Sequence, residues 1–230
     1  LSENPSQGFT LLDIPEHNKR FVHIHPGPEE IGRIYKPYLG IPANPIEFVK
    51  SLNSALKGLN TSPSSSNEIE TSQAHEDFID WGNMPLEAPN FGVDLTSAFR
   101  TLREKIKPDT IITNGAGNYA VWGHRLFRFQ NLKTQLAPIS GSMGYGLPAA
   151  IAAKLRYPDQ MVIALAGDGC FQMTSNEFAT AVQYNASVIL MVIDNGMYGT
   201  IRMHQHKHYK GKYKHTGLVN PDFAELGTAM

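Results

Sequence analysis

Two continuous runs of apolar residues, 161–166 and 188–193, constrain the fold of this chain more than any other feature. Each run has the length of a strand, and neither alternates apolar with polar side chains, so both faces of each strand must be buried. A helix is predicted between them over residues 175–184, with Thr174 and Glu177 as a capping box. Buried strands that alternate with helices are typical of parallel sheets. The sequence therefore predicts an α/β fold, a parallel sheet flanked by helices.

The rest of the chain divides by composition. Further elements are predicted as strands over 20–25 and 110–113 and as helices over 29–35, 45–56, 93–106, 119–127 and 147–155. Residues 58–90 are rich in Ser, Asn, Pro and Glu and are predicted to be a linker. Residues 1–57 hold too few elements for a domain, so we expect them to be the tail of one, and we expect residues 91–230 to form the sheet domain.

The two ends of the sequence suggest a piece of a longer protein. The chain begins at Leu1 rather than at Met, and it stops at Met230, shortly after a helix start that Asp222 is placed to cap. We therefore expect the sheet domain to be truncated at both ends.

Charge and cysteine content narrow the class of partner. The formal net charge is -1 and the isoelectric point is near 6.8, so the protein has no strong positive electrostatic field that would attract nucleic acid or an anionic membrane. Cys170 is the only cysteine, and no apolar run is long enough for a signal peptide or a membrane span. These features favour a cytoplasmic protein with a small-molecule ligand, and with neither nucleic acid nor membrane as partner.

Polar residues follow both apolar runs at the point where each strand should end. Asp168 stands between Gly167 and Gly169 after the first run, and Asn195 follows the second. Ligands of parallel sheets bind beyond the carboxyl ends of the strands. Mg²⁺ prefers oxygen ligands and keeps positions for phosphate and water. Asp168, Asn195 and the backbone carbonyl of Met197 are the predicted metal ligands.

These residues, in this order, resemble the thiamine diphosphate (ThDP) motif of the acetolactate synthase and 2-oxoacid decarboxylase superfamily. Residues 140–150 resemble the segment that receives the aminopyrimidine ring, and residues 115–119 resemble the first diphosphate loop, with Asn118-Tyr119 in place of the commoner Gln-His pair. Asp194 replaces the first Asn of the usual Asn-Asn pair. The resemblance implies cofactor contacts by Gly117, Asn118, Tyr119, Gly141, Met143, Gly167, Asp168, Gly169, Cys170, Asn195 and Met197.

The resemblance implies an enzyme that decarboxylates a 2-oxoacid and joins the product to a second carbonyl, as acetolactate synthases do, with ThDP and Mg²⁺ as cofactors. The activating Glu of this family comes from a pyrimidine-binding domain of the partner subunit, and no such domain is found in this sequence. We therefore expect no catalytic residue here, an inactive isolated chain, and a homodimer or homotetramer as the intact protein. Three alternatives stay open: an aryl-2-oxoacid (benzoylformate-type) decarboxylase, a ThDP-dependent oxidase that also binds FAD, and a non-catalytic remnant.

Residues 198–205 align with the substrate segment of the acetolactate synthases. Thr200, Ile201 and His204 are the candidate substrate contacts, and His204 stands where that family has Trp. The nearby run of His and Lys residues invites a metal site, but no Cys or carboxylate accompanies the histidines, which favours a solvated, lid-like segment. The spacing of Gly115, Gly117 and Ala120 is similar to a dinucleotide fingerprint, yet the acidic residue required after a second strand is missing.

Overall fold

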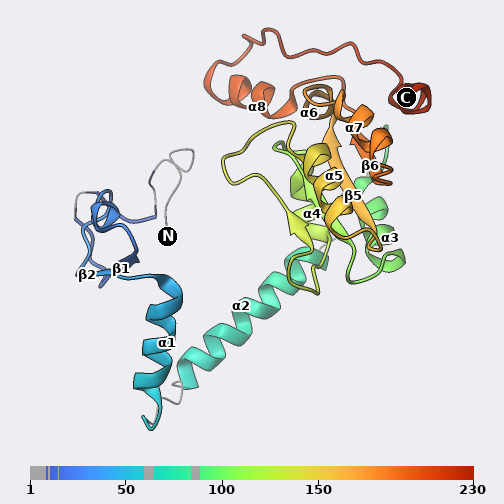
Figure 1. Cartoon of the computed structure of the whole chain (residues 1–230). Coiled ribbons are helices and arrows are strands. Elements are labelled where there is room, and N and C mark those ends of the chain that lie inside the picture. The colour runs from blue at the N-terminus through green and yellow to red at the C-terminus, as the bar shows by residue number, and fades with distance from the viewer. Residues whose placement is uncertain (1–8, 10, 15, 60–64, 84–88) are drawn as a thin grey trace. The chain divides into compact units, whose positions relative to one another are not determined.

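The computed structural model describes residues 9, 11–14, 16–59, 65–83 and 89–230 (Figure 1). The chain divides into two compact units, Leu1–Ala74 and His75–Met230. Among the described residues, no helix combines the length and the apolar character needed to cross a bilayer.

The first unit is built on two short strands, β1 (Val22–His25) and β2 (Leu39–Pro42), which pair in parallel. Strand β1 was expected. Strand β2 was not, because it contains Gly40 and Pro42, two residue types that are depleted in strands. The helix predicted over 29–35 is wrong: a single 3-10 turn, η2 (Pro28–Glu30), takes its place. At Gly32 the backbone turns into the left-handed region, with φ of +78°, and an α-helix cannot continue there.

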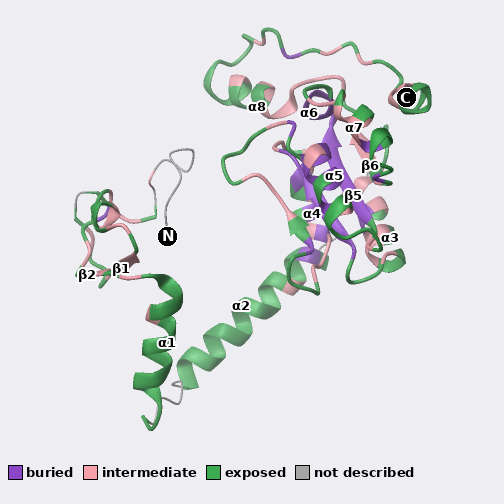
Figure 2. Ribbon diagram, in the orientation of Figure 1, coloured by how far each residue is buried: buried purple, intermediate pink, exposed green. Residues whose placement is uncertain are grey.

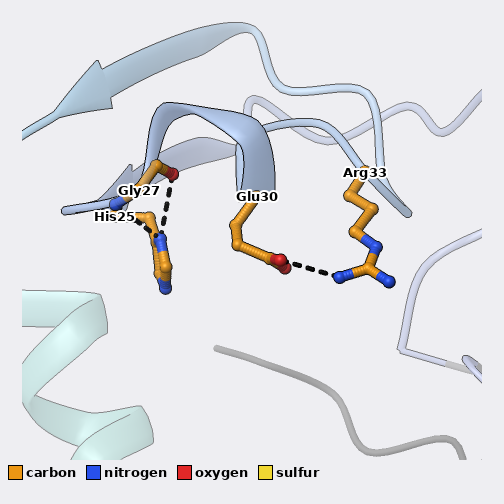
Figure 3. Close-up of polar contacts among 4 residues, drawn as sticks. All are labelled: His25, Gly27, Glu30 and Arg33. Carbon is orange, nitrogen blue, oxygen red and sulfur yellow. Dashed lines mark hydrogen bonds and ion pairs between the residues drawn. The ribbon is translucent and has the colours of Figure 1, made fainter.

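Local polar contacts order the turn after β1 (Figure 3). The backbone N–H of Gly27 donates to Nδ1 of His25 at 3.0 Å. The carboxylate of Glu30 lies 2.7 Å from the guanidinium of Arg33, and both side chains are largely exposed. Exposed ion pairs contribute about 1 kcal/mol or less to folding. These contacts therefore shape the turn without adding much stability.

Helix α1 (Pro45–Leu56) has the bounds predicted for it. Asn44 caps it by accepting a hydrogen bond from the N–H of Ile46 at 2.9 Å, and Pro45 occupies the first helical position, where its missing N–H costs nothing. No residue of α1 is buried (Figure 2).

Helix α2 (Ser65–Asn83) lies within the region predicted to be a linker. It was not predicted because its apolar residues are too few to form a periodic stripe. Carbonyls at its carboxyl end lack helical partners. Those of Trp81 and Asn83 accept hydrogen bonds from Arg125 and Arg100 at 3.0 and 2.9 Å, and Arg128 also donates to the carbonyl of Ile79 at 3.0 Å. Three arginine side chains thus stabilise the carboxyl end of α2, where the helix dipole is negative.

The second unit contains a four-stranded, fully parallel sheet with the strand order β4-β3-β5-β6. This arrangement confirms the α/β fold with a parallel sheet flanked by helices. The strands are β3 (Ile111–Asn114), β4 (Gln135–Leu136), β5 (Val162–Gly167) and β6 (Ile189–Ile193). The helices are α3 (Leu95–Lys105), α4 (Tyr119–Leu126), α5 (Gly146–Arg156), α6 (Asp168–Gln172), α7 (Glu177–Gln183), α8 (Gly199–His208) and α9 (Phe223–Ala229).

Strand β5 is buried along its whole length (Figure 2), as its uninterrupted apolar sequence predicts. Successive side chains point to opposite faces of the sheet. Ile163 and Leu165 pack with Phe99 of α3 and Leu126 of α4. Val162 and Ala164 pack with Ala150 and Ala153 of α5 on the other face. Helices on both faces therefore explain why polar residues do not alternate along this strand.

The predicted capping box before α7 is wrong. The hydroxyl of Thr174 donates to the carbonyl of Gly144 at 2.9 Å instead of capping the helix. Helix α7 begins at Glu177, whose carboxylate accepts from the hydroxyl of Thr180 at 2.9 Å. The Thr174 hydroxyl, which the local sequence pattern predicted to cap α7, instead makes a tertiary hydrogen bond. At α9, by contrast, Asp222 does accept hydrogen bonds from Ala224 N and Glu225 N.

Candidate cofactor and metal site

A solvent-open cleft with an empty volume of about 720 Å³ lies beyond the carboxyl ends of β3, β5 and β6. All eleven residues predicted to contact the cofactor line it, together with Thr200 and Ile201. His204, the third candidate for substrate contact, is not among the lining residues that the structure describes. Four further lining residues were not predicted: Ala116, Ile193, Tyr198 and Gly199. Each lies within two residues of a predicted position, so the lining segments are slightly longer than the motifs.

The predicted metal ligands emerge from two neighbouring strands. Gly167 of β5 pairs with Ile193 of β6. Asp168 follows Gly167 directly, and Asn195 lies two positions after Ile193. Asp168, Asn195 and Met197 all line the cleft. A carboxylate, an amide oxygen and a backbone carbonyl are the kinds of oxygen donor that Mg²⁺ binds.

Asp168 is a buried carboxylate without a cationic partner. Its relative exposure is 3%, and within the described part of the chain it takes part in no ion pair. A buried charge is costly unless it is paired or binds a metal. The donor set at this end of the sheet therefore fits a divalent cation.

Two glycines of the cleft lie beneath the ring of Tyr119. A Cβ atom at Gly117 or at Gly167 would come within 2.9 Å of this ring, and Gly117 also has φ of +152°. Only glycine lets both backbone segments approach Tyr119 so closely. The ring of Tyr119 thus fills the space that side chains at these two positions would occupy.

Cys170 connects the loops of the cleft through its thiol. Its Sγ accepts a hydrogen bond from Tyr119 Oη at 3.3 Å and from the N–H of Gly144 at 3.1 Å. Burial, strengthened by the hydrogen bond to Cys170, raises the pKa of Tyr119 well above its ordinary value, so the phenol stays protonated and donates. Cys170 itself is 3% exposed. Its contacts give the thiol a structural role.

The segment predicted to receive the pyrimidine ring runs into α5. Gly141 is exposed, has φ of +67°, and has no atom within 4 Å of the place where a Cβ would be. Met143 is half-buried and lines the cleft. Gly144 has φ of +81°, and its carbonyl accepts a hydrogen bond from the hydroxyl of Thr174. This loop is therefore anchored at Gly144 and open at Gly141.

The candidate substrate segment is the amino end of helix α8, which the sequence analysis did not predict as a helix. Thr200 Oγ1 accepts a hydrogen bond from the N–H of Asn118 at 3.0 Å, and the Asn118 amide contacts Met203 Sδ at 3.6 Å. The candidate substrate segment is thus tied directly to the loop of residues 115–119, the predicted diphosphate loop.

The histidines of α8 lie away from the cleft. His204 stacks on His208 with ring centroids 6.3 Å apart, and His206 Nδ1 lies 2.5 Å from Tyr213 Oη. Across the described ranges, no three His, Cys, Asp or Glu side chains are grouped so as to hold a metal.

The sequence of this chain is similar to a known protein family and to several known enzymes. Residues 115–230 match the family described as thiamine pyrophosphate enzyme, C-terminal TPP binding domain. An acetolactate synthase large subunit from Corynebacterium glutamicum is 31% identical over 236 residues, covering 95% of this chain and 36% of that protein. The mitochondrial acetolactate synthase of Schizosaccharomyces pombe is 29% identical over 223 residues, covering 95% of this chain and 33% of that protein.

A shorter alignment has a higher identity. The mitochondrial acetolactate synthase catalytic subunit of Aspergillus candidus is 40% identical over 125 residues, covering 54% of this chain and 18% of that protein. The chain thus spans little more than a third of the length of these relatives, or less.

Proposed function

Because this chain belongs to the family of thiamine pyrophosphate enzymes that share the C-terminal TPP-binding domain, we propose that its cleft holds the diphosphate of ThDP together with Mg²⁺. Thiamine pyrophosphate and thiamine diphosphate are the same compound. The observation that carries this proposal is Asp168, a buried carboxylate without a cation, which shares the cleft with the oxygen donors Asn195 and Met197.

Each group of lining residues has a distinct task in this proposal. Asp168, Asn195 and the carbonyl of Met197 would bind the metal ion. Backbone N–H groups at Gly117 and Gly167, which line the cleft, would receive the diphosphate, and the half-buried Met143 would support the thiazolium and pyrimidine rings. When bound, ThDP supplies a nucleophilic carbon and an electron sink for the loss of CO₂ from a 2-oxoacid. The protein contributes position and exclusion of water.

We propose further that the intact protein decarboxylates a 2-oxoacid and joins the product to a second carbonyl compound. Two relatives that align over 95% of this chain are named acetolactate synthases, which supports this reaction over simple decarboxylation or oxidation. Thr200 and Ile201, at the start of α8, are the residues of this chain placed to contact the substrate.

The partner in this proposal is a second subunit. The cleft is open to solvent, and Gly141 at its edge is exposed. A pyrimidine-binding domain of a partner subunit would close this side and supply the activating Glu. The intact protein would accordingly be a homodimer or a homotetramer.

The proposed function is tested on the intact protein by replacing the buried carboxylate. Asp168→Asn should weaken Mg²⁺-dependent ThDP binding by roughly 100-fold or more, since removing a group that only supports a metal ligand already costs about 10–100-fold. The matched control is Asp159→Asn, at an exposed position outside the cleft. Release of CO₂ is then assayed with pyruvate, benzoylformate, glyoxylate and oxalyl-CoA. A protein that binds ThDP but releases CO₂ from none of them would contradict the proposed reaction.

A further inference from the structure

We propose that Asn220 is a positioning residue for the metal ligand Asp168, and that it acts by tying the carboxylate of Asp168 to that of Asp194. This inference rests on the proposed function, because it concerns the same metal site. Asn220 was not singled out by any sequence motif, and neither Asn220 nor Asp194 is among the described residues that line the cleft. Asn220 therefore contacts Asp168 from outside the cleft lining, and Asp194 reaches it only through Asn220.

One amide group joins the carboxylates of the two strand ends. Asn220 Nδ2 donates to Asp168 Oδ2 at 2.8 Å and to Asp194 Oδ1 at 2.7 Å. Asp168 follows β5 directly, and Asp194 follows β6 directly. With one oxygen of Asp168 held by Asn220, its other oxygen is left for a metal ion in the cleft.

The orientation of the Asn220 amide follows from its neighbours. Ionised carboxylates only accept hydrogen bonds, so the NH₂ group must face Asp168 and Asp194. The amide oxygen then faces away from them, and it accepts from Gln172 Nε2 at 2.7 Å. Both N–H groups and the oxygen of Asn220 are thus engaged. An amide with all its groups bonded has one orientation, and it can hold a carboxylate in a fixed position.

The backbone around Asn220 is itself fastened to the metal loop. The N–H of Tyr198 donates to Thr216 O at 2.9 Å, and the N–H of Leu218 donates to Gly196 O at 2.8 Å. These two bonds flank an antiparallel bridge between Met197 and Gly217. The segment of residues 216–220, which we call the strap, therefore pairs with the loop that contains the predicted ligands Asn195 and Met197.

The presence of Asp194 explains why a donor is needed at position 220. Asp168 and Asp194 both accept from the same nitrogen, so two carboxylates face one small region. Like charges at short range repel each other. The Asn220 NH₂ group offsets this repulsion by donating one proton to each. Without it, Asp168 would turn away from Asp194 and lose the position that the metal site requires.

The test is a double-mutant cycle on cation binding. The affinity of the intact protein for Mn²⁺, a cation that suits the same oxygen ligands, is measured by electron paramagnetic resonance at a fixed ThDP concentration. We expect Asn220→Ala to weaken Mn²⁺ binding by about 10–100-fold, as is found when a side chain that orients a metal ligand is removed. Asn176→Ala is the matched control, because Asn176 is exposed and makes no side-chain capping bond.

The second arm distinguishes positioning from a general structural role. Adding Asp194→Asn to Asn220→Ala removes one of the two facing charges and supplies an amide donor next to Asp168. We expect this double variant to regain a large part of the Mn²⁺ affinity, whereas a loss of general stability would be deepened by a second substitution. If Asn220→Ala does not fold, Asn220→Ser replaces it, since one hydroxyl proton can serve only one of the two carboxylates.

The outcomes separate this inference from the proposed function. Unchanged Mn²⁺ affinity in a folded Asn220→Ala chain, or additive losses in the double variant, would overturn the role of Asn220 while leaving the metal site intact. Failure of the unsubstituted intact protein to bind Mn²⁺ at all would instead contradict the proposed function.

Discussion

Gly146 shows how closely two backbone segments approach each other beneath the cleft. A Cβ atom at this position would lie 3.0 Å from Leu165 O and 3.1 Å from Gly115 N. Both are backbone atoms of the sheet and of the loop that follows it, so neither can move aside as a flexible side chain would. The hydroxyl of Thr113 also donates to Gly146 O at 2.7 Å. The first turn of α5 is thus fitted against the strands without spare room.

We expect Gly146→Ala to lower the free energy of unfolding by about 1–3 kcal/mol, the usual cost of overpacking a core. The measurement is urea denaturation of the two proteins under the same conditions. Gly227→Ala is the control, since no atom lies within 4 Å of the position that a methyl group would take at Gly227. Equal losses in both variants would show that close backbone packing at Gly146 is not the cause.

His124 in α4 should make stability depend on pH. Its residue surface is partly exposed, but partial desolvation of the ring lowers its pKa below the ordinary value of 6.5. As the pH falls, the unfolded chain therefore binds this proton before the folded chain does. The stability that the neutral ring contributes is complete above pH 6.5 and is lost as the pH falls through the lower, folded-state pKa.

We accordingly expect His124→Gln to flatten the decline of Tm between about pH 8 and about pH 5. Thermal unfolding followed by circular dichroism measures this difference, with the exposed His75→Gln as control. Parallel Tm curves for the wild type and His124→Gln would contradict a lowered pKa at His124.

Among the elements, α8 depends most on a few contacts at its ends. None of its residues is buried. Its first turn is tied to the first diphosphate loop by the bond from Asn118 N to Thr200 Oγ1. Its last turn is held by His206 and Tyr213. Elements with few buried contacts open more readily than the core.

We expect Thr200→Val to increase the rate of amide hydrogen exchange in α8 by roughly 5-fold, which corresponds to the loss of a hydrogen bond of about 1 kcal/mol. Hydrogen exchange with mass spectrometry measures this rate, and the strands β3 and β5 serve as an internal reference. Thr200→Ser keeps the hydroxyl and should retain slow exchange. Fast exchange in Thr200→Ser as well would mean that the methyl group, not the hydrogen bond, holds α8.

At the scale of the whole molecule, the cleft is half of the proposed site. Its metal and diphosphate residues come from one sheet edge, while the side at Gly141 is open to solvent. Binding energy that depends on enclosing a ligand is lost when one wall is missing. We therefore expect the activity of the intact protein to depend on more than these residues.

We predict that the isolated chain binds ThDP only weakly in the presence of Mg²⁺ and releases no CO₂ from pyruvate. Isothermal titration calorimetry measures the affinity, and the comparison protein is the same chain joined to a pyrimidine-binding domain. Tight, Mg²⁺-dependent binding by the isolated chain would contradict the proposal that a partner subunit completes the site.

The parts of the fold and site that could be predicted from the sequence are those that depend on residues close together in the chain. Strands β5 and β6, the parallel sheet, and the polar residues at its edge are each encoded by neighbouring residues. The burial predicted for both faces of β6 is wrong, because β6 is an edge strand and none of its residues is buried. The eleven predicted cofactor contacts follow strand ends, and parallel strands bring their carboxyl ends to one edge. Helices α2 and α8 were missed because they lack a periodic apolar face of their own, and strand β2 was missed because it contains Gly40 and Pro42.

By itself, the sequence determined that a parallel sheet forms and that Gly167, Asp168 and Asn195 lie at its carboxyl edge, because local apolar patterning sets both. Only the tertiary structure decided the contacts between distant segments. Asn220 lies 52 residues beyond Asp168 in the chain, and Thr174 bonds Gly144 rather than capping α7. A side chain with several available partners bonds the one that folding brings nearest, and that choice depends on the packing of the whole unit.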